Sequence, residues 1–230
     1  MATTEAIFPP ELFDFLRELR SNNDREWFQG NRARYDSTVR APALRFVEAV
    51  GPRLATLSPH LVADARPVGG SLFRINRDIR FSADKSPYKT AVGMSFGHDA
   101  GRERPAPGLY LHLEPEQSFA GGGVHMPDAG ALSRIRDAIT AQTAEWSSIV
   151  GDARFGPMYE NTGETLKRVP RGYDPSHPFE ADLRRKGHTW HVRFSEAEVC
   201  DPAFLDTYVD ACAAATPFHR FLAEALGVPW

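Results

Sequence analysis

The chain has 230 residues, 42% of them hydrophobic and 25% charged, a composition that is typical of folded globular proteins and excludes wholesale disorder. Its net charge of −3 and its pI near 6.2 exclude a protein that coats nucleic acid or anionic membrane by bulk charge. The two cysteines, Cys200 and Cys212, are too few for a disulfide scaffold and too far apart for a zinc knuckle.

These properties indicate a single domain over residues 1–230 in a reducing compartment. The first residues, MATTEAIFPP, lack the basic start and the long apolar run of a signal peptide, and no segment is long and apolar enough to cross a bilayer. We therefore expect a cytoplasmic protein without a membrane partner. No motif indicates a cofactor or an oligomeric state.

Three helices are predicted in the N-terminal part of the chain. The first runs from about Pro10 to Arg20, where leucines and phenylalanines recur on one face. A capping-box spacing from Asn23 to Glu26 predicts a second helix, and the third begins near Pro42.

From Ser71 the hydrophobic period changes to two, which predicts a strand that continues to Phe81. Successive side chains of a strand alternate between faces, so this strand would have one apolar and one polar face. The two faces carry Phe73, Ile75, Ile79 and Phe81 on one side, and Arg74, Asn76, Asp78 and Arg80 on the other. Arg77 breaks the alternation, so it is either a buried, paired arginine or the mark of a shift in register.

Further strands are predicted at residues 91–97 and 109–114 and in the segments FAGGGVHM and HTWHVRF. Helices are predicted at residues 127–150 and 178–186 and in two closing segments that start at Asp201 and Thr216. Helices at both ends of a run of sequential strands indicate an α+β domain with a largely antiparallel sheet. We expect the helices to cover one face of the sheet and to leave a polar face uncovered.

The stretch RINRDIRFSADKSPYK packs five basic and two acidic side chains into an otherwise acidic chain. Its basic residues are Arg74, Arg77, Arg80, Lys85 and Lys89. Arginine forks and lysine ammonium groups bind phosphate or carboxylate oxygens, so the stretch is a candidate site for an anionic ligand. Lys167 and Arg168 would add to the site if their loop folds over it. The alternative is an internal ion-pair network with Asp78 and Asp84.

A second polar stripe is predicted on the strand at residues 109–114, where Tyr110, His112 and Glu114 share a face. If PEQS is the turn, His112 pairs with Gly121 and Tyr110 with Gly123, and the glycines leave a shallow pocket over both side chains. The alternatives are a bend or bulge at the glycines and a polar face that is merely solvated. His112 and Glu114 are the candidates for proton transfer, with Tyr110 as a ligand-binding neighbour.

No metal site is predicted. The same pairing sets His125 opposite Gly108, four residues along the strand from His112, which at roughly 13 Å is too far for a shared ion. His188 and His191 are three residues apart in a strand and therefore point to opposite faces. A P-loop, a G-x-S-x-G elbow and a histidine beside either cysteine are absent, so covalent acyl chemistry has no support.

Four long motifs in order resemble a widespread bacterial family of conserved hypothetical proteins, the domain of unknown function numbered twenty-four sixty-one. The motifs are FDFLRELRSNNDREWF, SLFRINRDIRFSADKSPYK, LYLHLEPEQSFAGGG and LKRVPRGYDPSHP. The likeness runs from about Phe8 to Leu226 and implies a single-domain cytoplasmic protein, without catalytic residues to carry across. The chain departs from the family at EPEQ, where glycine is usual after EP, and this position governs the turn that pairs His112 with Gly121.

Two functions are consistent with these patterns, and the sequence leaves open whether the protein is an enzyme. The leading hypothesis is that an anionic, phosphorylated small ligand binds on the basic polar face, with acid–base chemistry by His112 and Glu114. The rival is a non-catalytic module that docks an acidic protein segment or a nucleic-acid end on residues 74–89. Buried arginines paired with carboxylates would remove the support from both.

Overall fold

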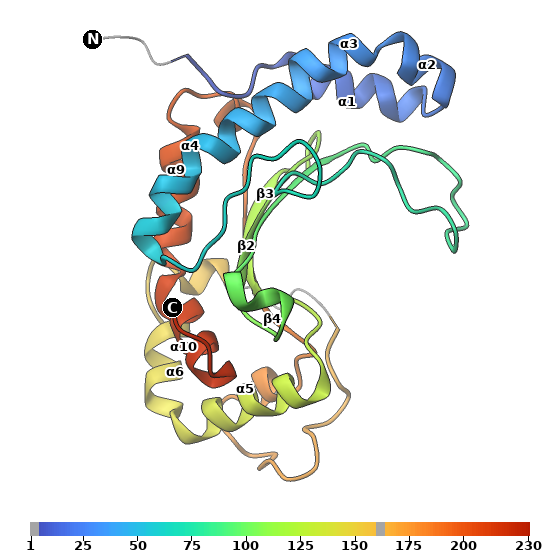
Figure 1. The fold of residues 1–230 in the computed structure, drawn as a ribbon. Helices are drawn as coiled ribbons and strands as arrows, with labels where there is room; N and C mark the ends of the chain where they lie inside the picture. Colours follow the sequence, from blue (N-terminus) through green and yellow to red (C-terminus); the bar gives the residue numbers. More distant parts are fainter. Residues whose placement is uncertain (1–4, 160–163) are drawn as a thin grey trace.

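The computed structural model describes residues 5–159 and 164–230 (Figure 1). Its N-terminal part is helical. The helices are α1 (Glu11–Ser21), α2 (Arg25–Gly30), α3 (Arg32–Tyr35) and, after a π-helical turn at Asp36–Arg40, α4 (Ala41–Leu57). The predicted apolar face of α1 is confirmed, because Leu12, Leu16 and Leu19 are fully buried at helical spacing.

A four-stranded antiparallel sheet follows, in the order β1-β2-β3-β4. The strands are β1 (Val92–Phe96), β2 (Gly108–Leu113), β3 (Phe119–Val124) and β4 (His188–Arg193). In β2 the side chains alternate as the sequence predicts: Leu109, Leu111 and Leu113 are buried, while Tyr110 and His112 lie on the other face. The sheet therefore has one face in the hydrophobic core and one face outside it.

Helices cover the core face of the sheet. Between β3 and β4 lie α5 (Ala129–Ala141), α6 (Thr143–Val150) and α7 (Glu180–Leu183), and after β4 come α8 (Glu196–Val199), α9 (Phe204–Ala214) and α10 (Thr216–Leu226). Helices α9 and α10 pack on β3, and α4 packs on β1 (Figure 1). This arrangement confirms the α+β fold with a largely antiparallel sheet. The helix predicted at residues 127–150 is two helices, because α5 ends at Ala141 and α6 begins at Thr143. Among the described residues, no helix combines the length and the apolar character that spanning a membrane requires.

The strand predicted from Ser71 to Phe81 is wrong. The segment makes only isolated bridges, Leu72 with Met94 and Asn76 with Tyr88, and residues 74–89 project from the body as a long arm (Figure 1). We call residues 74–89 the arm. The alternation of apolar residues misled the prediction because only the first part of the segment packs on the body: Ile75 is buried, whereas Phe81 is 96% exposed at the tip.

The root of the arm is fixed by α2. Asn23 donates a hydrogen bond from its amide nitrogen to the Tyr88 carbonyl (3.0 Å) and accepts one from the Tyr88 backbone N–H (3.1 Å). The Tyr88 ring stacks on Phe28, with centroids 4.1 Å apart. Asn23 is therefore not the helix cap that its spacing to Glu26 predicts, and Asp24 caps α2 instead.

The register between β2 and β3 differs by two residues from the predicted one. His112 pairs with Phe119 and Tyr110 with Gly121, and Gly123 rather than His125 lies opposite Gly108. The cause is the turn: the Gln117 backbone N–H donates to the Glu114 carbonyl, which closes the turn two residues earlier than PEQS would. Because a shift of two keeps every side chain on its face, the predicted polar face of β2 survives the error.

Candidate functional site

A large cavity lies over the face of the sheet that the helices leave uncovered. Its volume is about 1260 Å³. The residues that the pairing puts on this face are Ser95 of β1, Tyr110 and His112 of β2, Phe119 and Gly121 of β3, and Thr189, His191 and Arg193 of β4. All of them except His112 line the cavity, and the loop residues Ser71 and Phe73 line another wall. We call this space the sheet-face cavity.

Glycines on this face shape the cavity. Gly121 lines it, and a Cβ there would lie 2.8 Å from the Trp190 carbonyl oxygen, so the neighbouring strand approaches too closely for a side chain. Gly123 has φ +116°, a conformation that favours glycine. The backbone conformation of the alternative prediction is found at Gly123, and of the two side chains of the pocket prediction Tyr110 lines the cavity and His112 does not.

The polar side chains of β2 form a hydrogen-bonded row. The Tyr110 hydroxyl lies 3.1 Å from His112 Nδ1, and His112 Nε2 lies 3.0 Å from Glu114 Oε2. Arg20 of α1 extends the row by donating to Glu114 Oε1 (3.2 Å). The His112 ring also stacks on Phe119, with centroids 5.0 Å apart. Sequence spacing alone predicted this stripe, because residues two apart in a strand share a face.

The row fixes how a proton can move along it. A carboxylate only accepts, so His112 Nε2 carries the proton toward Glu114, and Nδ1 of the neutral ring accepts from the Tyr110 hydroxyl. Burial, and to a smaller extent the nearby Glu114 charge, raises the pKa of the Tyr110 phenol above its ordinary value. Tyr110 therefore keeps its proton near neutral pH, and it is the member of the row that lines the cavity.

Strand β4 contributes site residues that the sequence prediction missed. Thr189, His191 and Arg193 alternate along β4 and line the cavity together. Arg193 is exposed, and in the part of the chain that the structure describes no carboxylate lies within ion-pair distance of it. The signal was present in HTWHVRF, because Thr189, His191 and Arg193 alternate with His188, Trp190 and Val192. The predicted separation of His188 from His191 is confirmed, since His188 is buried on the helix side.

The basic residues of the arm lie outside the cavity. None of the described cavity residues comes from the segment 74–89. Arg77 pairs with Asp84, and Arg80 pairs with Asp78 at 2.6 Å. The two lysines donate to carbonyl oxygens of the same segment, Lys85 to Ile79 (3.0 Å) and Lys89 to Arg74 (3.1 Å). The island of positive charge is thus largely satisfied within the arm, as the ion-pair alternative predicts, although the side chains are exposed or half-buried rather than buried.

The other predicted cations do not join the arm. Arg74 is exposed on the arm itself. Lys167 and Arg168 are exposed in the loop that leads to α7, at the end of the molecule away from the arm (Figure 1). The structure therefore does not assemble the predicted anion site from Arg74, Arg77, Arg80, Lys85, Lys89, Lys167 and Arg168.

Neither cysteine is suited to nucleophilic chemistry. Burial raises the pKa of the Cys212 thiol to about 12, and Cys212 packs in the core as its helical stripe predicts. Burial, together with Glu196, raises the pKa of Cys200 to about 11. Potential metal ligands gather elsewhere: within the described residues, one group of histidine and acidic side chains comes close enough to hold an ion, formed by His60, His98 and Asp99.

Comparison with known proteins identifies a family. A family model described as a conserved hypothetical protein (DUF2461) matches residues 11–221. No curated protein and no solved structure matches the sequence.

Proposed function

The chain belongs to this family of conserved hypothetical proteins, and from the geometry of the sheet-face cavity we propose that it binds a small anionic ligand there. The observation that carries the proposal is the cavity itself: about 1260 Å³ of space over a polar sheet face, with Arg193 on its wall. Ligand sites are concave, and a few polar groups in them fix the orientation of the ligand.

Arg193 supports the anionic character of the ligand. A guanidinium group binds phosphate or carboxylate oxygens through two parallel N–H donors. The two acidic side chains on the wall have their own partners, because Asp64 pairs with Arg66 and Asp99 with His60. The ligand's charged group would lie against Arg193 and beside His191.

The walls also favour an apolar or aromatic part in the ligand. Phe119 and Phe73 line the cavity on either side of Tyr110, and both ring centroids lie 5.9 Å from that of Tyr110. Three aromatic rings around one space stack well on a flat apolar group. A phosphorylated or carboxylated aromatic molecule is therefore the class that fits best.

The row Tyr110–His112–Glu114 gives the ligand a group for proton transfer. A proton that leaves the Tyr110 hydroxyl passes to His112 Nδ1, and Glu114 stabilises the imidazolium that forms. In this scheme Tyr110 touches the ligand, and His112 and Glu114 act through it as positioning residues. The predicted roles of His112 and Glu114 in acid–base chemistry thus remain a proposal, with Tyr110 added as the group in contact.

Two matched variants test the proposal. We expect phenyl phosphate to raise the melting temperature of the wild type, since a ligand that binds only the native state stabilises it. Arg193→Ala should abolish the shift, whereas Arg80→Ala combined with Lys85→Ala should retain it. A shift that is lost in the arm variant and kept in Arg193→Ala would contradict the cavity and favour the arm.

The proton row has a separate test. We expect phenyl phosphate to move the NMR titration of the His112 imidazole in the wild type and to leave it unchanged in Tyr110→Phe. Equal movement in both proteins would show that Tyr110 does not link the ligand to His112.

The exposed tip of the arm favours a second function, the docking of an acidic protein segment or a nucleic-acid end. Phe81 is 96% exposed, and the Arg80 guanidinium lies 5.9 Å from its ring centroid. A base or a side chain could stack on such a pair. Fluorescence anisotropy with a single-stranded oligonucleotide and with a polyglutamate peptide tests this function: binding that Phe81→Ala abolishes supports it, and no binding of either probe contradicts it.

A further inference from the structure

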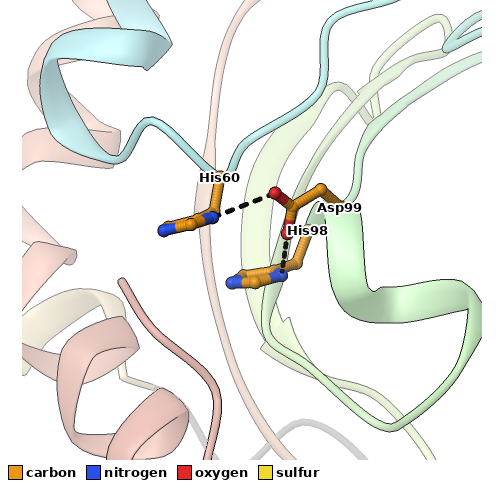
Figure 2. Close-up of side chains that lie close together, drawn as sticks. All are labelled: His60, His98 and Asp99. Carbon is orange, nitrogen blue, oxygen red and sulfur yellow. Dashed lines mark hydrogen bonds and ion pairs between the residues drawn. The ribbon is translucent and has the colours of Figure 1, made fainter.

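Three side chains with metal-ligating atoms meet at one end of the sheet-face cavity. His60 lies in the segment after α4, and His98 and Asp99 lie directly after β1. Figure 2 shows the Nδ1 atoms of both histidines turned toward the carboxylate of Asp99. The distances are 2.9 Å from His60 Nδ1 to Oδ2 and 2.9 Å from His98 Nδ1 to Oδ1.

We propose that His60, His98 and Asp99 bind a divalent transition-metal ion of the Zn²⁺ class. Two imidazole nitrogens and one carboxylate oxygen form a ligand set for such ions, and all the ligand atoms lie within 4.8 Å of one another. This site is independent of the anionic ligand, because it would hold its ion whether or not that ligand binds.

His98 is held in the tautomer that a metal requires. Its Nε2 lies 2.8 Å from the Pro229 carbonyl oxygen, which can only accept, so Nε2 carries the proton and Nδ1 is an acceptor with a lone pair. Metal-binding histidines commonly donate their second N–H to a backbone carbonyl in this way. The Ala100 backbone N–H donates to His98 Nδ1 (3.0 Å) and to Asp99 Oδ1 (2.7 Å), which marks both atoms as acceptors.

The backbone holds the two segments in place beneath the cluster. The Val62 N–H donates to the Gly97 carbonyl, and the Asp99 N–H donates to the His60 carbonyl, each at 2.9 Å. These bonds flank a β-bridge between Leu61 and His98. The ligands therefore sit on a paired scaffold rather than on two separate loops, which lowers the entropy that binding an ion would cost.

The two partly exposed ligands, His60 and Asp99, would adjust around an ion. Metal–nitrogen and metal–oxygen bonds near 2.0 Å place tetrahedral ligand atoms about 3.3 Å apart. The two histidine-to-carboxylate separations of 2.9 Å would open by a few tenths of an ångström, and Asp99, whose side chain is 53% exposed, is free to move. The His60 and His98 rings now stack with centroids 5.2 Å apart, so the half-buried His60 ring would turn until both Nδ1 atoms face the ion. His98 is buried and stays fixed.

The site would leave part of the ion's coordination open to the cavity. His98 and Asp99 line the cavity, together with Gly97 and Gly101, where an added Cβ would meet no atom within 4 Å. Three protein ligands and an open position are typical of zinc sites that bind water or substrate. An ion there would add a second positive group to the cavity that holds Arg193.

Metal titration of the tag-free chain, stripped with a chelator, tests the proposal. Co²⁺ is followed by its visible d–d absorption and Zn²⁺ by calorimetry, without any anionic ligand present. We expect one ion per chain for the wild type, and at least tenfold weaker binding for His60→Ala and for Asp99→Asn. The matched control is His125→Ala, which removes an exposed histidine of the same cavity and should bind as the wild type does.

His60 and Asp99 are chosen because both are partly exposed, whereas His98 also holds the C-terminal segment. Circular dichroism of each metal-free variant shows whether it is folded. The proposal is overturned if the wild type binds neither ion more tightly than His60→Ala does, or if His125→Ala weakens binding as much. Neither result bears on the phenyl phosphate test, so the two proposals stand or fall separately.

Discussion

The arm and the sheet-face cavity differ in how many charged side chains they hold and in where the partners of those side chains lie. The arm carries five basic residues, yet Arg77 and Arg80 pair with carboxylates a few residues away. The cavity has few charged groups, but Asp64, Asp99 and Arg193 come from separate segments of the chain and face one space. Charges that are close in sequence satisfy each other first, whereas a site needs groups that the fold brings together.

The largest difference in the free energy of unfolding between two matched variants is expected in the backbone beneath the cavity. Gly123→Ala forces a left-handed residue into a position where its Cβ would overlap the His188 carbonyl oxygen. We expect a loss of about 2–4 kcal/mol in the free energy of unfolding, measured by urea denaturation. Gly172→Ala is the matched control, because its φ of +100° is similar but its Cβ would meet open space. Equal losses in the two variants would contradict the close packing of β3 on β4.

Acid should weaken the sheet before it weakens the arm. Burial lowers the pKa of His188, in β4, and of His219, which packs behind β3, to about 3. In the unfolded chain both titrate near 6.5, so between about pH 6.5 and pH 3 the unfolded state binds more protons. The stabilisation is complete above pH 6.5 and falls below it, by about 1.4 kcal/mol per pH unit for each histidine.

Urea midpoints measured from pH 7 to pH 5 check this slope. His219→Gln removes one titrating group and keeps an acceptor for the Trp190 indole N–H, so the slope should fall by about half. The Asp84 carboxylate of the arm stays ionised in this pH range, because hydrogen bonds from Ser86 and Arg77 lower its pKa to about 2. An unchanged slope in His219→Gln would contradict a neutral, buried His219.

A glycine in the turn that sets the register of β2 and β3 should raise the stability of the protein. Glu116 has φ +67°, and with Pro115 before it and the bond from Gln117 to Glu114 the turn has the form that prefers glycine at this position. We expect Glu116→Gly to stabilise the protein by about 1 kcal/mol in urea denaturation. Glu116→Ala controls for the lost charge and should give no gain. A gain of the same size in Glu116→Ala would assign the effect to charge.

The smallest effect is expected in the arm. Arg80→Ala combined with Lys85→Ala removes exposed contacts that water replaces, so the urea midpoint should not change. A clear fall in the midpoint would show that the arm supports the fold.

The sequence predicted those parts whose local pattern agrees with their surroundings. Strands β2 and β4 alternate because one face meets helices and the other meets the cavity, and α1 shows its buried leucines at helical spacing. The arm broke the same rule, since Phe81 continues the alternation with charged residues but has no layer to pack on.

The candidate site residues that lie along one strand could be predicted from the sequence, and those that come from distant segments could not. The row from Tyr110 to Glu114 was predictable because it lies along one strand, while its partner Arg20 comes from α1. His60 and His98 are 38 residues apart and meet through a bridge that joins two loops. Nothing periodic marks such a pairing, so the cluster becomes visible only once the chain is folded.

The most direct test of the cavity is NMR chemical-shift mapping of the isotope-labelled protein with phenyl phosphate. If the ligand binds in the sheet-face cavity, the perturbed amides lie in β2, β3 and β4, around Tyr110, Gly121 and Arg193, with the arm unchanged. Perturbations confined to residues 74–89 would contradict it and return the function to the basic stretch.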